Sequence, residues 1–420
     1  MSVKEHSPFT EVQNNRMKIL MVNKFLYPKG GVETYVIKLG DVLKANGHEI
    51  EYFGIDDERN TLSNSAGAYA KNIDFAKGTL KNLTAPLSII YSSGARKKFR
   101  QVLDSFNPDI IHLNNIHFHL TPSIILEAQK YRKEKNKNLK IIYTAHDYQL
   151  ICPSHGLFTP DLSPCEKCIG GRYSNCIKNK CVKSSYAKSV LGAFEGYFWK
   201  HSRAYSYIDT IICPSTFLKS KLDLDKRFRD KTAALHNFVD EVEIKDTEKE
   251  NYILEFGHLS KDKGTYTVLE AAKAMPKYKF VFAGFGEAES AIKELPNCEF
   301  VGFKSGDELE ELIRKAAVTV YPSVWYENCP FSVIESQMYL TPVIGADIGG
   351  IPELIENGKT GELFEAGNSD ELVKKLRILL DDKNKLKEHS KNCRSIKIET
   401  PQSYYEKLIN IYNGEPNGNL

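Results

Sequence analysis

The stretch KILMVNKFLYPKGGVETYVIKLGDVLKANGHEIEYF, residues 18–53, contains the pattern that decides the fold. Its first six residues form an apolar run of the length of a buried strand. Residues 33–46 place apolar side chains at helical spacing, and Gly47 follows as a typical helix end. HEIEYF then begins another strand. The stretch therefore predicts the strand–helix–strand unit of a parallel sheet covered by helices.

The same alternation runs through the chain in two series. The first series continues with strands expected at residues 109–113, 140–144 and 210–213. The second restarts at YILEFG, residues 252–257, and goes on through KFVFAG, CEFVGF, VTVYPS and TPVIGA. Between them the charged stretch DEVEIKDTEKE suits an exposed connection. We therefore expect an α/β protein with two Rossmann-like domains.

Length supports this division, because 420 residues exceed what one hydrophobic core usually organises. We expect a disordered tail at residues 1–16, a first domain at 17–240 with a Cys-rich insertion at 152–183, a second domain at 241–398, and a final helix within 399–420.

Charge and composition exclude some classes of protein. With 57 basic and 54 acidic residues, the chain lacks the electrostatic footprint of a nucleic-acid binder. The polar N-terminus MSVKEHSPFTEVQNNR has no apolar signal region, and no run reaches the ~18 apolar residues that span a bilayer. We expect a cytoplasmic protein.

Two turns after strands are candidates for binding an anion. PKGGVETY places Gly30 and Gly31 directly before a helix, where backbone N–H groups can approach a negative ligand. GHLSKDKG, residues 257–264, places Lys263 after a strand, where its ammonium suits phosphate oxygens. The alternatives are an ordinary tight turn and a solvated lysine.

The stretch YENCPFSVIESQ, residues 326–337, places Glu327 and Glu335 on either side of Pro330. Pro330 suits the first turn of a helix, so we expect the helix to start near Phe331. Its exposed N–H groups favour an anion between the two carboxylates, and carboxylates accept hydrogen bonds from vicinal diols. A nucleotide sugar carries a diphosphate and two such diols. The alternative is that both glutamates are solvated charges.

These residues resemble the retaining GT-B glycosyltransferases of family 4, and the resemblance covers most of the chain. The matching elements are the E-x7-E pair Glu327 and Glu335, the segment TPVIGADIGGIPELIENGKTGELFEAG after it, the GHLSKDKG turn and the glycine pair. The chain is most similar to bacterial members that assemble surface polysaccharides and carry an HDY segment followed by cysteines. This resemblance implies two Rossmann-like domains facing a cleft, the first for the acceptor and the second for the nucleotide sugar, with the final helix crossing back to the first domain.

The resemblance also implies roles for single residues. Glu335 would hold the ribose hydroxyls, Glu327 the transferred sugar, Lys263 the diphosphate, and Gly30 and Gly31 the facing loop. Two positions depart from the family: His258 stands where an arginine is usual, which makes the charge of the site pH-dependent, and Asn328 replaces a glycine. The expected donor-binding set is Gly30, Gly31, His258, Lys263, Asn328, Pro330, Phe331 and Glu335.

The implied reaction is hexosyl or N-acetylhexosaminyl transfer (EC 2.4) with retention, from a UDP- or GDP-sugar to a glycan or lipid-linked acceptor. It needs no catalytic metal or other cofactor, because stabilising the leaving diphosphate lets an acceptor hydroxyl attack the same face. His117 and His146, after first-domain strands, are the candidates to contact sugar or acceptor beside Glu327; the alternative for both is a structural hydrogen bond. The family's usual histidine would fall near Asn114.

The basic runs ARKKFR and KYRKEKNKNLK, residues 95–100 and 130–140, could rest on anionic lipid at the inner face of the plasma membrane, at about 1 kcal/mol per basic residue. Solvated helix faces are the alternative. Other functions left open are a nucleotide-sugar-binding protein without turnover, a GT-B epimerase and a phosphorylase.

The insertion contains Cys165, Cys168, Cys176 and Cys181 in the spacing C-x2-C-x7-C-x4-C, with Cys152 as a fifth candidate. A loop with so little apolar material needs another source of order, and a structural zinc held by four thiolates would supply it. Loosely packed thiols, an iron–sulfur cluster and disulfides are the alternatives.

Overall fold

The computed structural model describes residues 16–72, 85–244 and 247–415, and the side chains of 85–87 are not included. The predicted tail therefore lies, except for Arg16, outside the described residues. Two compact units make up the chain, Met1–Ile142 and Tyr143–Leu420. Among the described residues, no helix is both long and apolar enough to cross a bilayer.

The first sheet has six strands in the order β2-β1-β3-β4-β5-β6, and β1 is parallel to both β2 and β3. The strands are β1 Lys18–Val22, β2 Glu49–Phe53, β3 Ile110–Leu113, β4 Lys140–Thr144, β5 Thr210–Cys213 and β6 Thr232–Ala234. All strands expected from the first series are confirmed. The helices between them are α1 Gly31–Ala45, α2 Ala85–Ile90, α3 Ser93–Phe106, α4 Ser123–Glu134, α5 Ser174–Lys178, α6 Tyr186–Ser202 and α7 Thr216–Asp223.

The second sheet is parallel in the order β12-β11-β10-β7-β8-β9. Its strands are β7 Tyr252–His258, β8 Lys279–Phe285, β9 Cys298–Gly302, β10 Val318–Tyr321, β11 Val343–Ala346 and β12 Gly361–Phe364. The helices that follow β7 in the chain are α8 Thr265–Ala274, α9 Glu289–Lys293, α10 Asp307–Lys315, α11 Phe331–Met338, α12 Ser369–Leu380, α13 Lys383–Asn392 and α14 Pro401–Asn413.

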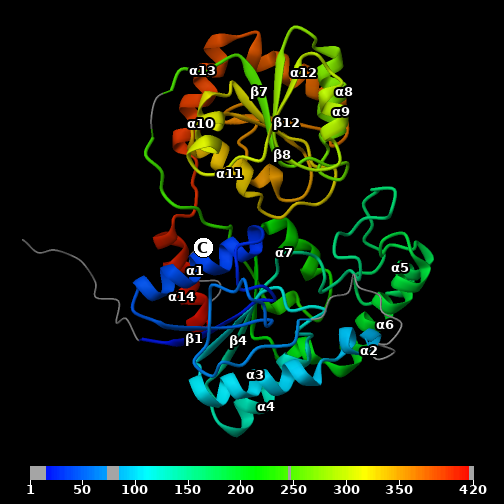
Figure 1. The fold of residues 1–420 in the computed structure, drawn as a ribbon, viewed down its shortest axis with the longest axis vertical. Helices are drawn as coiled ribbons and strands as arrows, with labels where there is room; N and C mark the ends of the chain where they lie inside the picture. Colours follow the sequence, from blue (N-terminus) through cyan, green and yellow to red (C-terminus); the bar gives the residue numbers. More distant parts are fainter. Residues whose placement is uncertain (1–15, 73–84, 245–246, 416–420) are drawn as a thin grey trace, which may run out of the picture. The chain divides into compact units, whose positions relative to one another are not determined.

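Helices cover both faces of this second sheet, with α8 and α9 to one side and α10 to the other in Figure 1. One core joins sheet residues such as Phe280 and Phe282 to α8 and α12. A smaller core joins Leu254 and Val281 to Ile313 of α10. Burial on both faces explains the continuous apolar strands, and it leaves the loops at the strand ends to carry polar side chains.

The strands change sheet between β6 and β7, in the stretch where the sequence predicts a domain boundary at 240/241, whereas the compact units divide at Ile142 and Tyr143. The segment before α14 returns to the end of the first series. Phe238 forms a parallel bridge with Glu399, and its ring lies 4.7 Å from that of Tyr404.

Candidate active site

A close backbone contact positions the turn that carries Lys263. Gly264 has φ of 82°, and a Cβ there would lie 1.9 Å from the carbonyl oxygen of Pro322. Val324 also donates its N–H to the carbonyl of Asp262 at 3.2 Å. Because only glycine permits this left-handed contact, the β7–α8 turn lies against the residues that follow β10.

Lys263 and Glu327 form the centre of the site. The Lys263 Nζ donates to Glu327 Oε1 at 2.6 Å and lies 4.2 Å from the centre of the Trp325 ring. The same carboxylate accepts from the Trp325 indole and, at 3.3 Å, from the Ser323 hydroxyl. Burial, with the charge and hydrogen bond of this carboxylate, raises the pKa of Tyr321 well above its usual value. Glu327 is therefore held in one orientation by groups from the β7 and β10 loops.

A glycine pair supports the backbone of this loop. A Cβ on Gly349, whose φ is 64°, would lie 2.5 Å from the Glu327 carbonyl oxygen, and one on Gly350 would lie 1.8 Å from that of Asn328. Gly350 donates its N–H to the Glu327 carbonyl at 2.7 Å. The DIGG segment after β11 thus approaches the Glu327 loop more closely than any side chain would allow.

Helix α11 begins at Phe331, as predicted, with Pro330 in the N-cap position. No side chain caps this helix, so backbone N–H groups of its first turn are available to a ligand. Val333 and Ile334 are buried, while Glu335 is half-buried. The sequence therefore placed both glutamates correctly relative to the helix start.

The HDY segment meets the Glu327 loop through Asn328, which donates its side-chain N–H to the His146 carbonyl at 2.8 Å. Burial lowers the pKa of His146 to about 4, so its imidazole is neutral at pH 7. Burial raises the pKa of the nearby Tyr148, and the Glu327 charge adds to this. The structure thus brings His146 to the loop that carries Glu327.

Sequence reasoning missed an aromatic group around this loop. The ring of Tyr326 lies 4.8 Å from Phe217 and 6.2 Å from Tyr148, and Trp325 lies 5.6 Å from Phe158. The paired aromatics WY directly before Glu327 were the available signal, because adjacent large rings beside a functional carboxylate often form the wall of a pocket.

His258 lies at the exposed end of β7. The Ser260 hydroxyl is 3.1 Å from its Nδ1, and its ring lies 5.3 Å from that of the exposed Phe285. Below it Glu255 is buried in β7 and accepts from the Thr265 hydroxyl at 2.6 Å; burial raises its pKa to about 8. His258 therefore ends the strand that leads into the Lys263 turn, whereas Glu255 belongs to the core.

The first compact unit holds the remaining candidates. Gly30 is the N-cap of α1, but its φ of −168° is open to any residue, so backbone strain does not explain the glycine there. The first turn also contains the buried Glu33, which accepts from Asn23 at 3.2 Å. His117 is buried after β3. The roles of Gly30, Gly31 and His117 stay predictions.

The cysteines of the insertion are free thiols. Cys168 and Cys176 share a small buried cluster with Tyr173 and Ala193, while Cys181 packs at its edge. Burial, together with the neighbouring cysteines, raises the pKa of Cys181 to about 12. Within the described residues, no three or more His, Cys, Asp or Glu side chains are placed to hold a metal ion. The thiols as arranged thus do not fit a metal, and the zinc site stays a prediction.

Comparison with known families agrees with this geometry. Residues 29–243 match the family described as Glycosyltransferase Family 4, and residues 239–396 match the one described as Glycosyl transferases group 1. The chain belongs to glycosyltransferase family 4. The two matches meet near residue 240, in the stretch that separates the two sheets.

Two relatives illustrate how far the likeness reaches. An uncharacterized 42.6 kDa protein in the cps region of Klebsiella pneumoniae is 26% identical over 80% of this chain and 87% of its own length. An uncharacterized glycosyltransferase of Methanocaldococcus jannaschii is 26% identical over 51% of this chain. The match spans 62% of that relative, less than two thirds of its length.

Solved structures show the fold. Sucrose-phosphate synthase from Thermosynechococcus elongatus superposes with a TM-score of 0.68 at 16% identity, over 95% of this chain and 99% of its own. HepE from Anabaena, solved in complex with UDP-glucose, superposes with a TM-score of 0.63 at 16% identity. The superposition covers 95% of this chain and 100% of HepE. The two six-stranded sheets are therefore those of a GT-B glycosyltransferase.

Proposed function

We propose that this family 4 member transfers a hexose or N-acetylhexosamine from a UDP- or GDP-sugar, with retention of configuration, to a glycan or lipid-linked acceptor during surface polysaccharide synthesis. The observation that carries the proposal is the contact of Lys263 and Glu327 beside the uncapped start of α11. An ammonium and free helix N–H groups suit a diphosphate. The complex of HepE with UDP-glucose and the cps-region relative support the donor class and the pathway.

In this proposal Lys263 and the first turn of α11 stabilise the diphosphate as the bond from the anomeric carbon to phosphate oxygen breaks. The acceptor oxygen bonds to the anomeric carbon from the same face, and its proton passes to the leaving phosphate oxygen. Glu335 binds the ribose diol and Glu327 orients the sugar. His146, neutral at pH 7, offers a hydrogen bond rather than a charge.

The test is to incubate the purified chain with UDP- and GDP-sugars, with and without a membrane extract. Transfer of label to lipid or glycan, with the anomeric configuration read from proton NMR coupling, supports the proposal. Donor binding without turnover favours a binding protein, altered free nucleotide sugar favours an epimerase, and an inverted product contradicts the retaining reaction.

We also propose that helix α6 rests on an anionic lipid surface. Tyr186, Val190, Phe194 and Phe198 are 62%, 39%, 54% and 36% exposed, and their spacing of four places them along one side of α6. Residues 167–194 contain six basic residues and no acidic ones: Lys167, Arg172, Lys178, Lys180, Lys183 and Lys188. Aromatic side chains with lysines beside them are typical of a helix lying in a membrane interface.

This placement differs from the basic runs expected from sequence. Arg96 and Arg100 of α3 bind Glu127 at 2.6 and 3.2 Å, so these cations are neutralised within the chain. Sedimentation with vesicles of anionic or neutral lipid tests α6. Tyr186→Ser/Phe194→Ser should lose binding to anionic vesicles, whereas Phe303→Ser, at a residue 67% exposed on the second domain, should keep it. The proposal is contradicted if both variants bind anionic vesicles equally. It is also contradicted if the wild type self-associates rather than binding the vesicles.

A further inference from the structure

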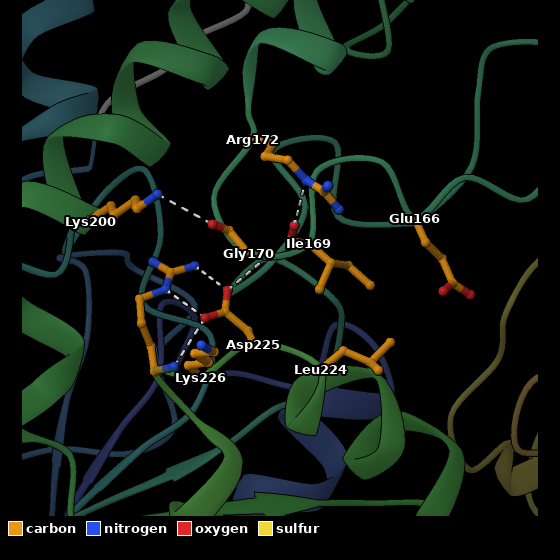
Figure 2. Close-up of a pocket in the computed structure, with 9 residues that line it drawn as sticks. Glu166, Ile169, Gly170, Arg172, Lys200, Leu224, Asp225 and Lys226 are labelled. Carbon is orange, nitrogen blue, oxygen red and sulfur yellow. Dashed lines mark hydrogen bonds and ion pairs between the residues drawn. The ribbon is translucent and has the colours of Figure 1, made fainter.

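A basic cavity of about 650 Å³ lies between the Cys-rich insertion, α6 and the residues after α7. Figure 2 shows Arg172 and Lys200 on one side of it, with Asp225 and Lys226 on the other. Its remaining lining residues are Glu166, Ile169, Gly170, Leu224 and Arg227. None of the residues that line it takes part in the proposed reaction.

Both carboxylates of the cavity are already paired with a cation. Asp225, almost fully buried, takes a bidentate interaction from Arg227, at 3.0 Å from Nε and 2.7 Å from Nη2, and accepts the Gly170 N–H at 3.2 Å. Glu166 binds the neighbouring Lys221 at 2.5 Å. Three lining cations remain in excess: Arg172, Lys200 and Lys226.

The bonds recorded for these three do not neutralise them. The Arg172 Nε donates to the Ile169 carbonyl at 3.3 Å, and the Lys200 Nζ donates to the carbonyls of Gly170 and Gly171 at 3.2 and 3.3 Å. Lys226 is exposed at the rim. In addition, Arg227 has a buried Nη1 with no hydrogen-bond partner within the described part of the chain. Arg227 therefore keeps one guanidinium N–H that the ion pair with Asp225 does not use.

The cavity borders the loop of the active site. Glu166, one of its lining residues, accepts at 3.5 Å from the hydroxyl of Tyr326, and Tyr326 precedes Glu327. Lys221 lies 5.6 Å from the centre of the Tyr326 ring. The cavity is therefore linked, through Glu166 and Tyr326, to the loop that carries Glu327.

We infer that this cavity binds a diphosphate group of the acceptor. The inference rests on the proposed transferase function, because it names the acceptor's chemistry. Within the described part of the chain, Arg172, Lys200 and Lys226 have no carboxylate partner, so they can neutralise a diphosphate group. The volume is in the range of small-ligand sites. A lipid diphosphate and free diphosphate share this chemistry.

Calorimetric titration of the full chain tests the inference without requiring turnover. The titrants are inorganic pyrophosphate and farnesyl diphosphate, with UDP at saturation to occupy the donor site. Arg172→Gln/Lys226→Gln should weaken pyrophosphate binding by about 100-fold, because each of the two lost charge-assisted bonds is worth about tenfold. The matched control is Lys277→Gln/Lys374→Gln, which removes the same charge from exposed positions that do not line the cavity.

Each outcome is decisive. Weaker binding in the cavity variant alone, with unchanged circular dichroism and melting, supports the site. If farnesyl diphosphate binds more tightly than pyrophosphate, the acceptor is a lipid. If the two titrants bind equally, the acceptor is water-soluble. The inference is overturned if wild type does not bind pyrophosphate. It is also overturned if the control variant loses as much affinity as the cavity variant, or if only Lys263→Ala loses affinity. Because donor turnover is measured separately, failure here leaves the proposed transfer reaction intact.

Discussion

The ammonium of Lys263 lies 2.6 Å from Oε1 of Glu327, so the cation expected to bind phosphate already contacts the carboxylate expected to orient the sugar. Because the side chains are 25% and 13% exposed, solvent screens this pair incompletely. A donor diphosphate must therefore share Lys263 with Glu327.

Removing Lys263 or Glu335 should weaken donor binding. Lys263→Ala deletes a charge next to the diphosphate, and Glu335→Ala leaves the ribose hydroxyls unpaired. Each should cost about 1.5–3 kcal/mol of binding free energy. Calorimetry with the UDP- or GDP-sugar measures this, and Lys279→Ala, at a lysine that begins β8 and pairs with Glu299, is the control. Unchanged affinity in both variants would place the donor elsewhere.

Glu327→Gln should lower turnover more than affinity for the free nucleoside diphosphate. The amide keeps the size of the carboxylate but releases Lys263 and weakens the indole and hydroxyl bonds that orient it. We expect the maximal rate of transfer to fall at least tenfold while UDP or GDP binds as tightly as before or more tightly. A matching loss of nucleotide affinity would contradict the role in orienting the sugar.

Gly350→Ala should destabilise the Glu327 loop. Its Cβ would lie 1.8 Å from a backbone carbonyl that has no side-chain freedom, and such overpacking costs about 1–3 kcal/mol. Gly94→Ala in helix α3 meets nothing within 4 Å and should be neutral or slightly stabilising. Urea unfolding of the two variants measures the difference, and equal stability would contradict the close approach.

Glu255 should make the protein lose stability as the pH rises. Burial raises the pKa of its carboxyl to about 8, against an ordinary value near 4.5, so the folded state keeps a proton that the unfolded state releases. Its contribution is full below pH 4.5 and is lost as the pH rises from there to about 8. In Glu255→Gln the free energy of unfolding, measured by denaturant titration, should decrease less as the pH rises. Glu299→Gln, at an exposed carboxylate, should show the same pH dependence as wild type.

Metal analysis of protein purified without a polyhistidine tag decides the zinc prediction. About one zinc per chain, lost in Cys165→Ser/Cys168→Ser, would mean that the thiols rearrange around the ion. Metal-free wild type with freely titratable thiols in residues 152–183 would show that the buried thiol cluster alone orders the insertion.

Local patterns predicted most of what the structure has in the second sheet and in α11, because apolar runs, Pro330 and the glutamate spacing each act within a few residues. The contacts that hold the site together come from distant positions. Gly349 and Gly350 lie more than 20 residues after Glu327 in the chain, and His146 reaches Asn328 across 182 positions. The basic cavity joins Arg172, Lys200 and Lys226, which in sequence read as separate surface charges. Only the fold reveals which distant residues meet.

The indole of Trp325 gives this protein an optical reporter of its own active site. The chain has two tryptophans, and the other, Trp199, is 1% exposed in α6. Trp325 donates to Glu327 and lies under the Lys263 ammonium, a cation that quenches or shifts indole emission as it moves. In a Trp199→Phe background, all tryptophan emission comes from the residue that contacts both Lys263 and Glu327. Donor libraries can then be screened by fluorescence, without a labelled sugar or a known acceptor.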